Sequence, residues 1–432
     1  MKNYSYITVL SNWLLGYDKY SNTYRKDLLS KSTYPNEFYL LDDSMLDIGL
    51  EKAIKLLKKI NINNNIIIRI ETQINSEIVK KNTKNGKGYV ITQNFIPVSK
   101  VYFYIDNQWK EKIIEDVNSL SYLLKDNNLY SYEELTPRTL SILPIAFACQ
   151  AKCKFCFSES SISFEQEHFQ IDMENLRSLC TLAKLKGADR FVITGGGEPG
   201  ILKFSNLLNI VREAKIAFNK IVLITNAVFL SKLPEEEVIQ KISQLIDSGL
   251  STLCISYHHY NSVLNKEIMG LDNKVEYLVN VINSHPSRNK LKLRLICVLQ
   301  KKYIDSIDEI DKYINFACKL QVEQVCFKEL YVSSTTESLY ANNKENIYCL
   351  EHQTPLNEVI KWANQKKAEQ VSKLPWGSPI FKYYQKNQCI EIAAYTEPSV
   401  GWEKYNKIAR SWNILSDGKC YVSLEDKSSL IN

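Results

Sequence analysis

Three cysteines close together constrain this chain more than any other feature. Cys149, Cys153 and Cys156 form a Cys-x₃-Cys-x₂-Cys loop. Such a loop supplies three thiolates, one fewer than an iron–sulfur cube or a structural zinc usually takes from protein. Either a fourth ligand lies elsewhere in the chain, or one metal position is open to a molecule that reacts there. The open position favours an enzyme over a structural metal site.

Length and composition are typical of a globular protein. The chain has 432 residues, 45% hydrophobic and 24% charged, which suffices for two or three domains. Its 11 cysteines lack the paired spacing of a secreted disulfide framework. The apolar run 7–17 lacks a small-residue cleavage site, and no run reaches the ~18 apolar residues of a membrane helix. We therefore expect a cytoplasmic protein with no membrane partner.

The charge balance gives no sign of a nucleic-acid partner. The net charge is +6, from 54 basic and 48 acidic residues. The clearest basic run, 80–87, fits a solvated hairpin tip that turns at Asn85 and Gly86. The 26 tyrosines do not alternate with basic residues as in a single-strand-binding surface.

The middle of the chain alternates strands with helices. One helical segment is capped by Asp172 and stopped by Gly187, and another starts at Pro234 and stops at Gly249. This alternation predicts parallel β-α units, and six units suit an open barrel better than a closed eightfold one. Function in such a fold lies at the carboxyl ends of strands, and the cysteines directly follow the first. The six strand-like runs are 142–148, 191–194, 221–225, 252–256, 291–299 and 324–327.

The predicted fold is therefore an α/β protein with a partial (β/α)6 TIM-type barrel over residues 138–331. Residues 1–137 mix a helical stretch with strand-like runs and are expected to form an N-terminal α+β accessory domain. Residues 332–432 begin with a polar run at 333–338, expected as a loop at the barrel mouth, and include Trp362, Trp376, Trp402 and Trp412. We expect them to pack as a C-terminal extension that shapes the substrate pocket.

A second motif follows the second predicted strand. It reads Thr194-Gly-Gly-Gly-Glu-Pro-Gly200. Glycines in this position let backbone groups approach a ligand closely, and the carboxylate beside them can accept hydrogen bonds from an amine. Alone, the run would also suit a simple turn with a surface glutamate.

Together the two motifs resemble the radical S-adenosylmethionine (radical SAM) superfamily. Its cluster loop reads Cys-x₃-Cys-x-aromatic-Cys, and Phe155 stands at the aromatic position. Its Gly-Gly-Glu-Pro motif is matched by residues 196–199. The resemblance covers residues 140–330, and it implies one 4Fe–4S cluster and S-adenosylmethionine as cofactors.

The resemblance also implies roles for single residues. Cys149, Cys153 and Cys156 would bind three irons, and the fourth iron would bind the amino and carboxylate groups of S-adenosylmethionine. Gly196, Gly197 and Glu198 would contact the amino group, Phe155 would lie near the adenine, and Asn226 and Ser256 would contact the cofactor from later strand ends. Arg294 would reach its carboxylate. Ala227 replaces the glycine that many members carry after the asparagine.

Catalytic residues are less clearly indicated. His258 and His259 follow the fourth strand and could orient substrate, move a proton, or simply be hydrogen-bonded loop residues. Lys328 lies on the sixth strand and faces ligand or solvent. Cys349, Cys389 and Cys420 stand alone in the sequence, which argues against an auxiliary cluster. Four other cysteines, expected as buried core thiols, are Cys180, Cys254, Cys297 and Cys318.

The predicted function is that of a radical SAM enzyme of oxidoreductase or lyase type. The resemblance implies reductive cleavage of S-adenosylmethionine to a 5′-deoxyadenosyl radical, which abstracts hydrogen from a peptide or natural-product intermediate. An electron donor such as flavodoxin or ferredoxin would be required. The alternatives are a radical SAM enzyme acting on a sugar, nucleoside or RNA base, or a metal-binding structural protein.

Overall fold

The computed structural model describes two units of the chain. Five N-terminal strands are described by their backbone, followed by residues 132–165, 171–333, 340, 343–385, 388–398, 403 and 406–431. One unit comprises residues 1–131 and 332–351, and the other comprises residues 132–331 and 352–432.

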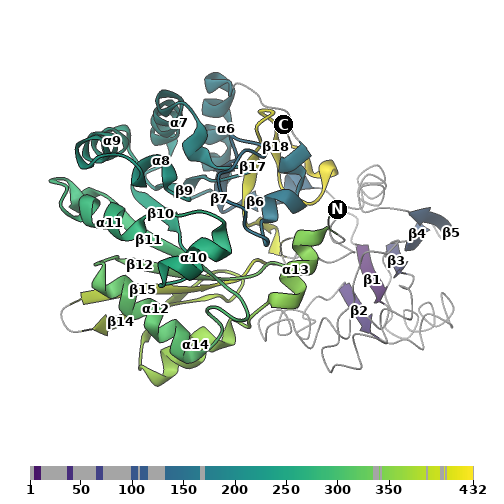
Figure 1. The fold of residues 1–432 in the computed structure, drawn as a ribbon. Coiled ribbons are helices and arrows are strands. Elements are labelled where there is room, and N and C mark those ends of the chain that lie inside the picture. Colours follow the sequence, from purple (N-terminus) through teal and green to yellow (C-terminus); the bar gives the residue numbers. More distant parts are fainter. Residues whose placement is uncertain are drawn as a thin grey trace. The chain divides into compact units, whose positions relative to one another are not determined.

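The first unit contains a five-stranded mixed sheet in the order β2-β1-β3-β4-β5 (Figure 1). β1 pairs in parallel with both neighbours, whereas β3, β4 and β5 pair antiparallel. Helix α13 (Lys344–His352) lies mainly in this unit. The predicted helix at 45–60, the strand at 88–93, the basic run at 80–87 and the loop at 334–338 lie outside the described residues. The strands are β1 (Tyr4–Leu10), β2 (Glu37–Leu41), β3 (Asn65–Glu71), β4 (Ser99–Ile105) and β5 (Gln108–Ile114).

The second unit contains the six predicted strands in sequence order along one sheet (Figure 1). Each pairs in parallel with the next, so their carboxyl ends share one edge. The α/β class is therefore confirmed. The strands are β7 (Thr139–Ile142), β8 (Arg190–Ile193), β9 (Ile221–Thr225), β10 (Thr252–Ser256), β11 (Lys292–Leu299) and β12 (Gln324–Glu329).

The helices between these strands begin and end where the sequence predicts. The side chain of Asp172 accepts a hydrogen bond from the backbone of Glu174 and caps α6. Gly249 ends α9 with φ of 113°, a conformation that suits glycine. Short helices α8 (Val228–Ser231) and α10 (Ser262–Met269) follow β9 and β10. The longer helices are α6 (Met173–Leu185), α7 (Phe204–Ala217), α9 (Glu235–Ser248), α11 (Val275–Asn283) and α12 (Ile307–Lys319).

The first strand of this series differs from the prediction of 142–148. β7 ends at Ile142, and residues 143–148 form an irregular approach to the cysteines. Pro144 lacks a backbone N–H and cannot continue a central strand. The backbone of Leu143 instead donates to the carbonyl of Ile414, from the far end of the chain. The cysteine loop is thus separated from its strand by a segment that other loops hold in place.

The C-terminal extension adds strands to both sides of the six. β15 (Gln388–Tyr395) pairs in parallel with β12, and β17 (Trp412–Ile414) pairs in parallel with β7. Eight parallel strands therefore lie side by side, with antiparallel β14 (Pro379–Gln385), β13 (Glu369–Lys373) and β18 (Cys420–Tyr421) beyond them. A separate pair joins β16 (Ile408–Ala409) to β6 (Thr136–Pro137).

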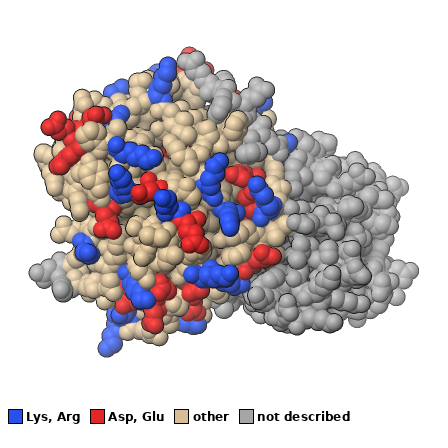
Figure 2. All heavy atoms as spheres, in the orientation of Figure 1, with Lys and Arg blue, Asp and Glu red and all other residues tan. Residues whose placement is uncertain are grey.

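The surface and core of the described residues are ordinary for a globular protein. Basic and acidic side chains alternate over the described part of the face in Figure 2. The described chain contains no helix with both the length and the apolar character needed to cross a bilayer. Trp362, Trp376 and Trp412 are buried, as predicted, and Trp402 lies outside the described residues. The predicted core thiols Cys180, Cys254, Cys297 and Cys318 are also buried.

Trp362 on α14 (Asn357–Gln365) attaches the extension to α12. Its side chain is fully buried, and its indole N–H donates to Asp311 at 2.8 Å. We predict that Trp362→Ala lowers the free energy of unfolding by about 3–5 kcal/mol, because it leaves a cavity and removes a hydrogen bond. Urea denaturation of the cluster-free protein measures this. Tyr384→Ala, at a side chain that is 62% exposed, is the control and should leave the midpoint nearly unchanged. Equal midpoints for both variants would contradict the prediction.

Candidate active site

The cysteine loop rests on the carboxyl end of α10. The backbone of Lys152 donates to the carbonyl of Met269 at 2.7 Å. Cys153 and Phe155 pack against the apolar cluster of Val228, Ile268, Met269 and Leu271. Cys149 is exposed, and Cys153 and Cys156 are partly exposed. The three cysteines therefore lie together on one short, partly exposed loop.

The chemistry of this loop fits an iron–sulfur cluster. Burial raises the pKa of all three thiols, and at Cys153 the neighbouring Cys156 and Cys149 raise it further. A bound cation would stabilise the thiolates that burial disfavours. In the described residues no three His, Cys, Asp or Glu side chains converge on a single-ion site. A 4Fe–4S cube does not require such convergence, because each thiolate binds a different iron.

The glycine run packs directly against the segment that leads into the cysteines. The backbone of Gly197 donates to Ile145, and that of Glu198 donates to Ala148, at 2.6 and 2.8 Å. A Cβ atom on Gly196 would lie 2.2 Å from the carbonyl oxygen of Ile145, and one on Gly197 would lie 2.1 Å from that of Ala148. Glycine is required here because two backbone segments touch. The two sequence motifs thus form one structure at the carboxyl ends of β7 and β8.

The carboxylate of Glu198 is buried beneath this contact. Oε1 accepts hydrogen bonds from the backbone of Gly200 at 2.8 Å and the hydroxyl of Thr225 at 2.5 Å, and Oε2 accepts from the backbone of Asn226 at 2.7 Å. Burial raises the pKa of Glu198, and these bonds oppose the shift. The side chain therefore joins the loop after β8 to the loop after β9.

Asn226 extends the same network to the cysteines. Its side-chain amide donates to Gln150 at 3.1 Å and lies 3.8 Å from the sulfur of Cys149. The backbone carbonyl of Asn226 accepts a hydrogen bond from the side-chain amide of Asn273, which also donates to the backbone carbonyl of Ser256. Ala227 has φ of 63°, a left-handed conformation that favours glycine. A glycine adopts this conformation more easily, which explains why many members of the family that the sequence resembles carry glycine at the position of Ala227.

Phe155 and His258 meet across the site. Their ring centroids are 5.1 Å apart in an edge-on arrangement. Nδ1 of His258 accepts from the backbone of Val298 at 3.2 Å, which places the proton of the neutral ring on Nε2. Burial lowers the pKa of His258 to about 3. The residue is therefore suited to donate a hydrogen bond and poorly suited to act as a base near neutral pH.

The other predicted residues are placed less directly. Nδ1 of His259 accepts from the backbone of Asn261, and Nε2 lies 3.8 Å from Glu309 on α12. The hydroxyl of Ser256 makes no hydrogen bond to any described residue. Lys328 lies 2.7 Å from Glu397.

Arg294 is held within the sheet. Its guanidinium donates twice to Oε1 of Gln324, at 3.0 and 2.7 Å, and Gln324 in turn donates to Glu391. Arg294 pairs in register with Cys254 of β10 and Gln324 of β12. The structure thus brings Arg294 to Gln324 rather than to the cysteine loop.

Sequence reasoning missed several residues of this network. Thr225 and Gln150 adjoin the recognised motifs, so their closeness to the site could have been inferred from position. Asn273 and Glu397 lie in segments without any motif, and only the folded chain brings Asn273 to Asn226 and Glu397 to Lys328.

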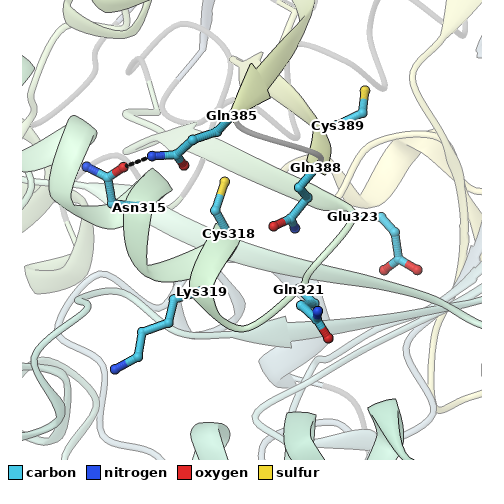
Figure 3. Close-up of a pocket in the computed structure, with 8 residues that line it drawn as sticks. All are labelled: Asn315, Cys318, Lys319, Gln321, Glu323, Gln385, Gln388 and Cys389. Atoms are coloured by element: carbon cyan, nitrogen blue, oxygen red, sulfur yellow. Dashed lines mark hydrogen bonds between the residues drawn. The ribbon is translucent and has the colours of Figure 1, made fainter.

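A separate hollow of about 650 Å³ lies at the opposite edge of the sheet. It is lined by the end of α12 and by the turn between β14 and β15, and Gln385 donates to Asn315 at 2.6 Å across one wall (Figure 3). Cys318 and Cys389 also line it. Because Glu323 immediately precedes β12, this hollow lies at the amino ends of the strands, where parallel α/β folds do not place catalytic residues.

We predict that Glu198→Ala lowers the unfolding free energy of the cluster-free protein by at least about 1–3 kcal/mol, because it leaves three buried donors without an acceptor. Thermal unfolding followed by circular dichroism measures the change. Glu213→Ala is the matched control, since that carboxylate pairs with the exposed Arg177 on the surface. If both variants unfold at the wild-type temperature, Glu198 does not hold the loops.

We predict that stability falls as the pH drops below 6.5, in part through His258. The unfolded chain protonates this residue near pH 6.5, whereas the folded protein does so only near pH 3. Folding therefore excludes a proton in this window, and the residue contributes a loss of up to about 1.4 kcal/mol per pH unit. Urea denaturation of cluster-free protein between pH 6.5 and 5 should show a shallower dependence for His258→Gln. An identical slope in the variant would show that His258 is not buried as a neutral ring.

Comparison with known proteins finds a family model that matches the residues around this site. Residues 143–326 match the family model of the radical SAM superfamily. No curated protein sequence matches the chain significantly.

Among solved structures, SuiB of Streptococcus suis bound to S-adenosylmethionine is 20% identical with a TM-score of 0.42, and the match covers 70% of this chain and 63% of that one. SuiB bound to the precursor peptide SuiA is 19% identical with a TM-score of 0.43, covering 81% and 72%. HydG of Carboxydothermus hydrogenoformans, a hydrogenase maturase, is 14% identical with a TM-score of 0.35, covering 56% of each chain. The cofactors of the superfamily are a 4Fe–4S cluster and S-adenosylmethionine. Residues 143–326 of this chain are thus similar to the radical SAM domain.

Proposed function

We propose that this protein is a radical SAM enzyme in which Cys149, Cys153 and Cys156 bind one 4Fe–4S cluster. The observation that carries the proposal is the direct packing of the glycine run against the segment before Cys149. Three thiolates on an accessible loop leave one iron of a cube without a protein ligand. We propose that the amino acid end of S-adenosylmethionine binds beside the glycine run of Gly196 and Gly197.

When bound, the cofactors would together supply a radical able to remove hydrogen from an unactivated C–H bond. The chain's own residues orient and enclose them. Asn226 holds the loop through Gln150, and Glu198 fixes the two loops beside it. Phe155 contributes an apolar wall, and Nε2 of His258 offers a neutral hydrogen-bond donor beside it. Rigid support of this kind limits the positions a reactive group can take.

We further propose that the substrate is a peptide or natural-product intermediate and that flavodoxin or ferredoxin supplies the electron. The support is the large share of the chain outside the matched domain. Residues 352–432 contribute strands on both sides of the six central ones, and residues 1–131 belong to a unit with its own sheet. Such additions are suited to recognise a substrate larger than the cofactor.

A search of the neighbouring genes tests the substrate class. A short precursor-peptide gene would provide a candidate substrate. Incubation of this peptide with reconstituted enzyme should change the mass of the peptide, and 5′-deoxyadenosine should form in the same reaction. Modification of a sugar, nucleoside or RNA base instead would overturn the peptide proposal and leave the enzyme class intact.

We predict that Cys149→Ala, Cys153→Ala or Cys156→Ala each abolishes the absorbance near ~400 nm after anaerobic reconstitution, together with cleavage of S-adenosylmethionine, because two thiolates are too few to hold the cube. Iron analysis and chromatography of 5′-deoxyadenosine and methionine measure both effects.

Cys180→Ala is the matched control, because this buried thiol on α6 should not affect the cluster. Full iron loading and cleavage in any triplet variant would overturn the assignment. If wild-type protein binds metal but never yields 5′-deoxyadenosine with a strong reductant, the structural alternative is favoured.

A further inference from the structure

Two cations share one buried carboxylate at the carboxyl edge of the sheet. Glu397 follows β15 and is only 8% exposed in its side chain. Nζ of Lys328, on β12, lies 2.7 Å from Oε1 of Glu397, and Nη1 of Arg410 contacts Oε2. The hydroxyl of Tyr395 also donates to Oε2, at 2.8 Å. These interactions lower the pKa of Glu397 to about 2, chiefly through Arg410 and then Lys328 against the effect of burial.

This cluster lies near the cysteine loop. Phe157 follows Cys156 directly, and its ring meets that of Tyr331 edge-on with centroids 5.2 Å apart. Tyr331 comes two residues after the end of β12, the strand that carries Lys328. A ligand beside Lys328 and Arg410 would therefore lie on the same edge of the sheet as the cysteines.

The side chains of Lys328 and Arg410 each have hydrogen-bond donors that no described residue uses. The side chains of Lys328 and Arg410 are 36% and 27% exposed, whereas the carboxylate that joins them is buried. Within the described residues, Lys328 bonds only Glu397 and lies over the ring of Tyr395, and the Arg410 guanidinium bonds only Glu397. Glu403 accepts from the backbone N–H of Arg410 and not from its guanidinium. Both cations can therefore still donate to an incoming group.

We propose that Lys328 and Arg410 bind a carboxylate of the substrate, an inference that rests on the proposed radical SAM function. An ammonium and a guanidinium fork together suit the two oxygens of a carboxylate. Glu397 already compensates part of the two positive charges, and Glu403 beside the backbone of Arg410 adds a further negative charge, so a ligand with a single negative charge suits the group better than a dianion. A phosphate dianion would leave an excess negative charge in a largely enclosed place, which disfavours it.

The carboxylate could come from the substrate or from S-adenosylmethionine itself. The position of Lys328 favours the substrate, because β12 lies five strands along the sheet from β7, whose loop carries the cysteines. The amino acid end of the cofactor is expected beside the glycine run after β8. Glu397 is the positioning residue of the site, since it holds both cations without needing to touch the ligand.

The test uses N-acetyl-L-glutamate and its isosteric amide N-acetyl-L-glutamine as probes. Their binding to reconstituted enzyme with S-adenosylmethionine is measured by saturation-transfer NMR and calorimetry. We expect the acid to bind at least about tenfold more tightly than the amide in wild-type protein, because a charge-assisted pair is replaced by a neutral one. Lys328→Met should reduce this preference severalfold, and Lys328→Arg should retain it. Lys312→Met, on the surface of α12, is the control and should behave as wild type.

Lys328 variants are used because Arg410 and Tyr395 still bond Glu397 in them, so the buried carboxylate keeps partners. The affinity for S-adenosylmethionine and the uncoupled yield of 5′-deoxyadenosine are measured in parallel, so that an effect on cofactor binding can be told apart from an effect on the carboxylate probe. Equal binding of acid and amide, no binding of either, or an unaltered preference in Lys328→Met would each overturn the proposal. A tenfold loss of cofactor affinity in Lys328→Met would assign the cation to the cofactor and also overturn it. Absence of 5′-deoxyadenosine in wild-type protein would instead contradict the proposed function, since probe binding is measured independently.

Discussion

The buried carboxylate of Glu198 is the interaction on which the rest of the site depends. Gly200, Thr225 and Asn226 all donate to it, so the loops after β8 and β9 are fixed relative to each other. Asn226 then holds Gln150 in the cysteine loop. A carboxylate with several donors can stay buried at moderate cost, whereas the donors without it would each lose an acceptor. Glu198 and Asn226, which lie outside the cysteine loop, therefore help to fix the geometry of that loop.

The two outer strands of the six-stranded core, β7 and β12, impose a second constraint. Strands β7 and β12 would expose unpaired backbone groups if the chain ended after β12. The extension pairs with both of them, through β17 and β15. Ser411 meets Ser141 at 2.7 Å, and the indole of Trp412 donates to the carbonyl of Leu135. The extension thus completes the same sheet that carries the site, although it follows the central strands by many residues.

Much of this arrangement could be predicted from local sequence, because local signals produce it. The caps at Asp172 and Gly249 define helix ends, and strand ends place Asn226 and His258 at the carboxyl edge. The first strand was predicted at 142–148 but lies at Thr139–Ile142, because Ile145 and Ala146 after Pro144 are buried without pairing to a strand. The partners of Lys328 could not be inferred, since Glu397 and Arg410 reach it only through pairings between distant segments.

The sheet contains two cationic sites that sequence alone cannot tell apart. Arg294 lies on β11 and Lys328 on β12, and both carry a positive charge. Arg294 donates twice to Gln324, which continues to Glu391, so its charge is compensated across neighbouring strands. Lys328 shares a single carboxylate with Arg410 and retains donors toward open space. The number of donors left unused, more than the charge itself, separates a residue that stabilises the sheet from one suited to bind a ligand.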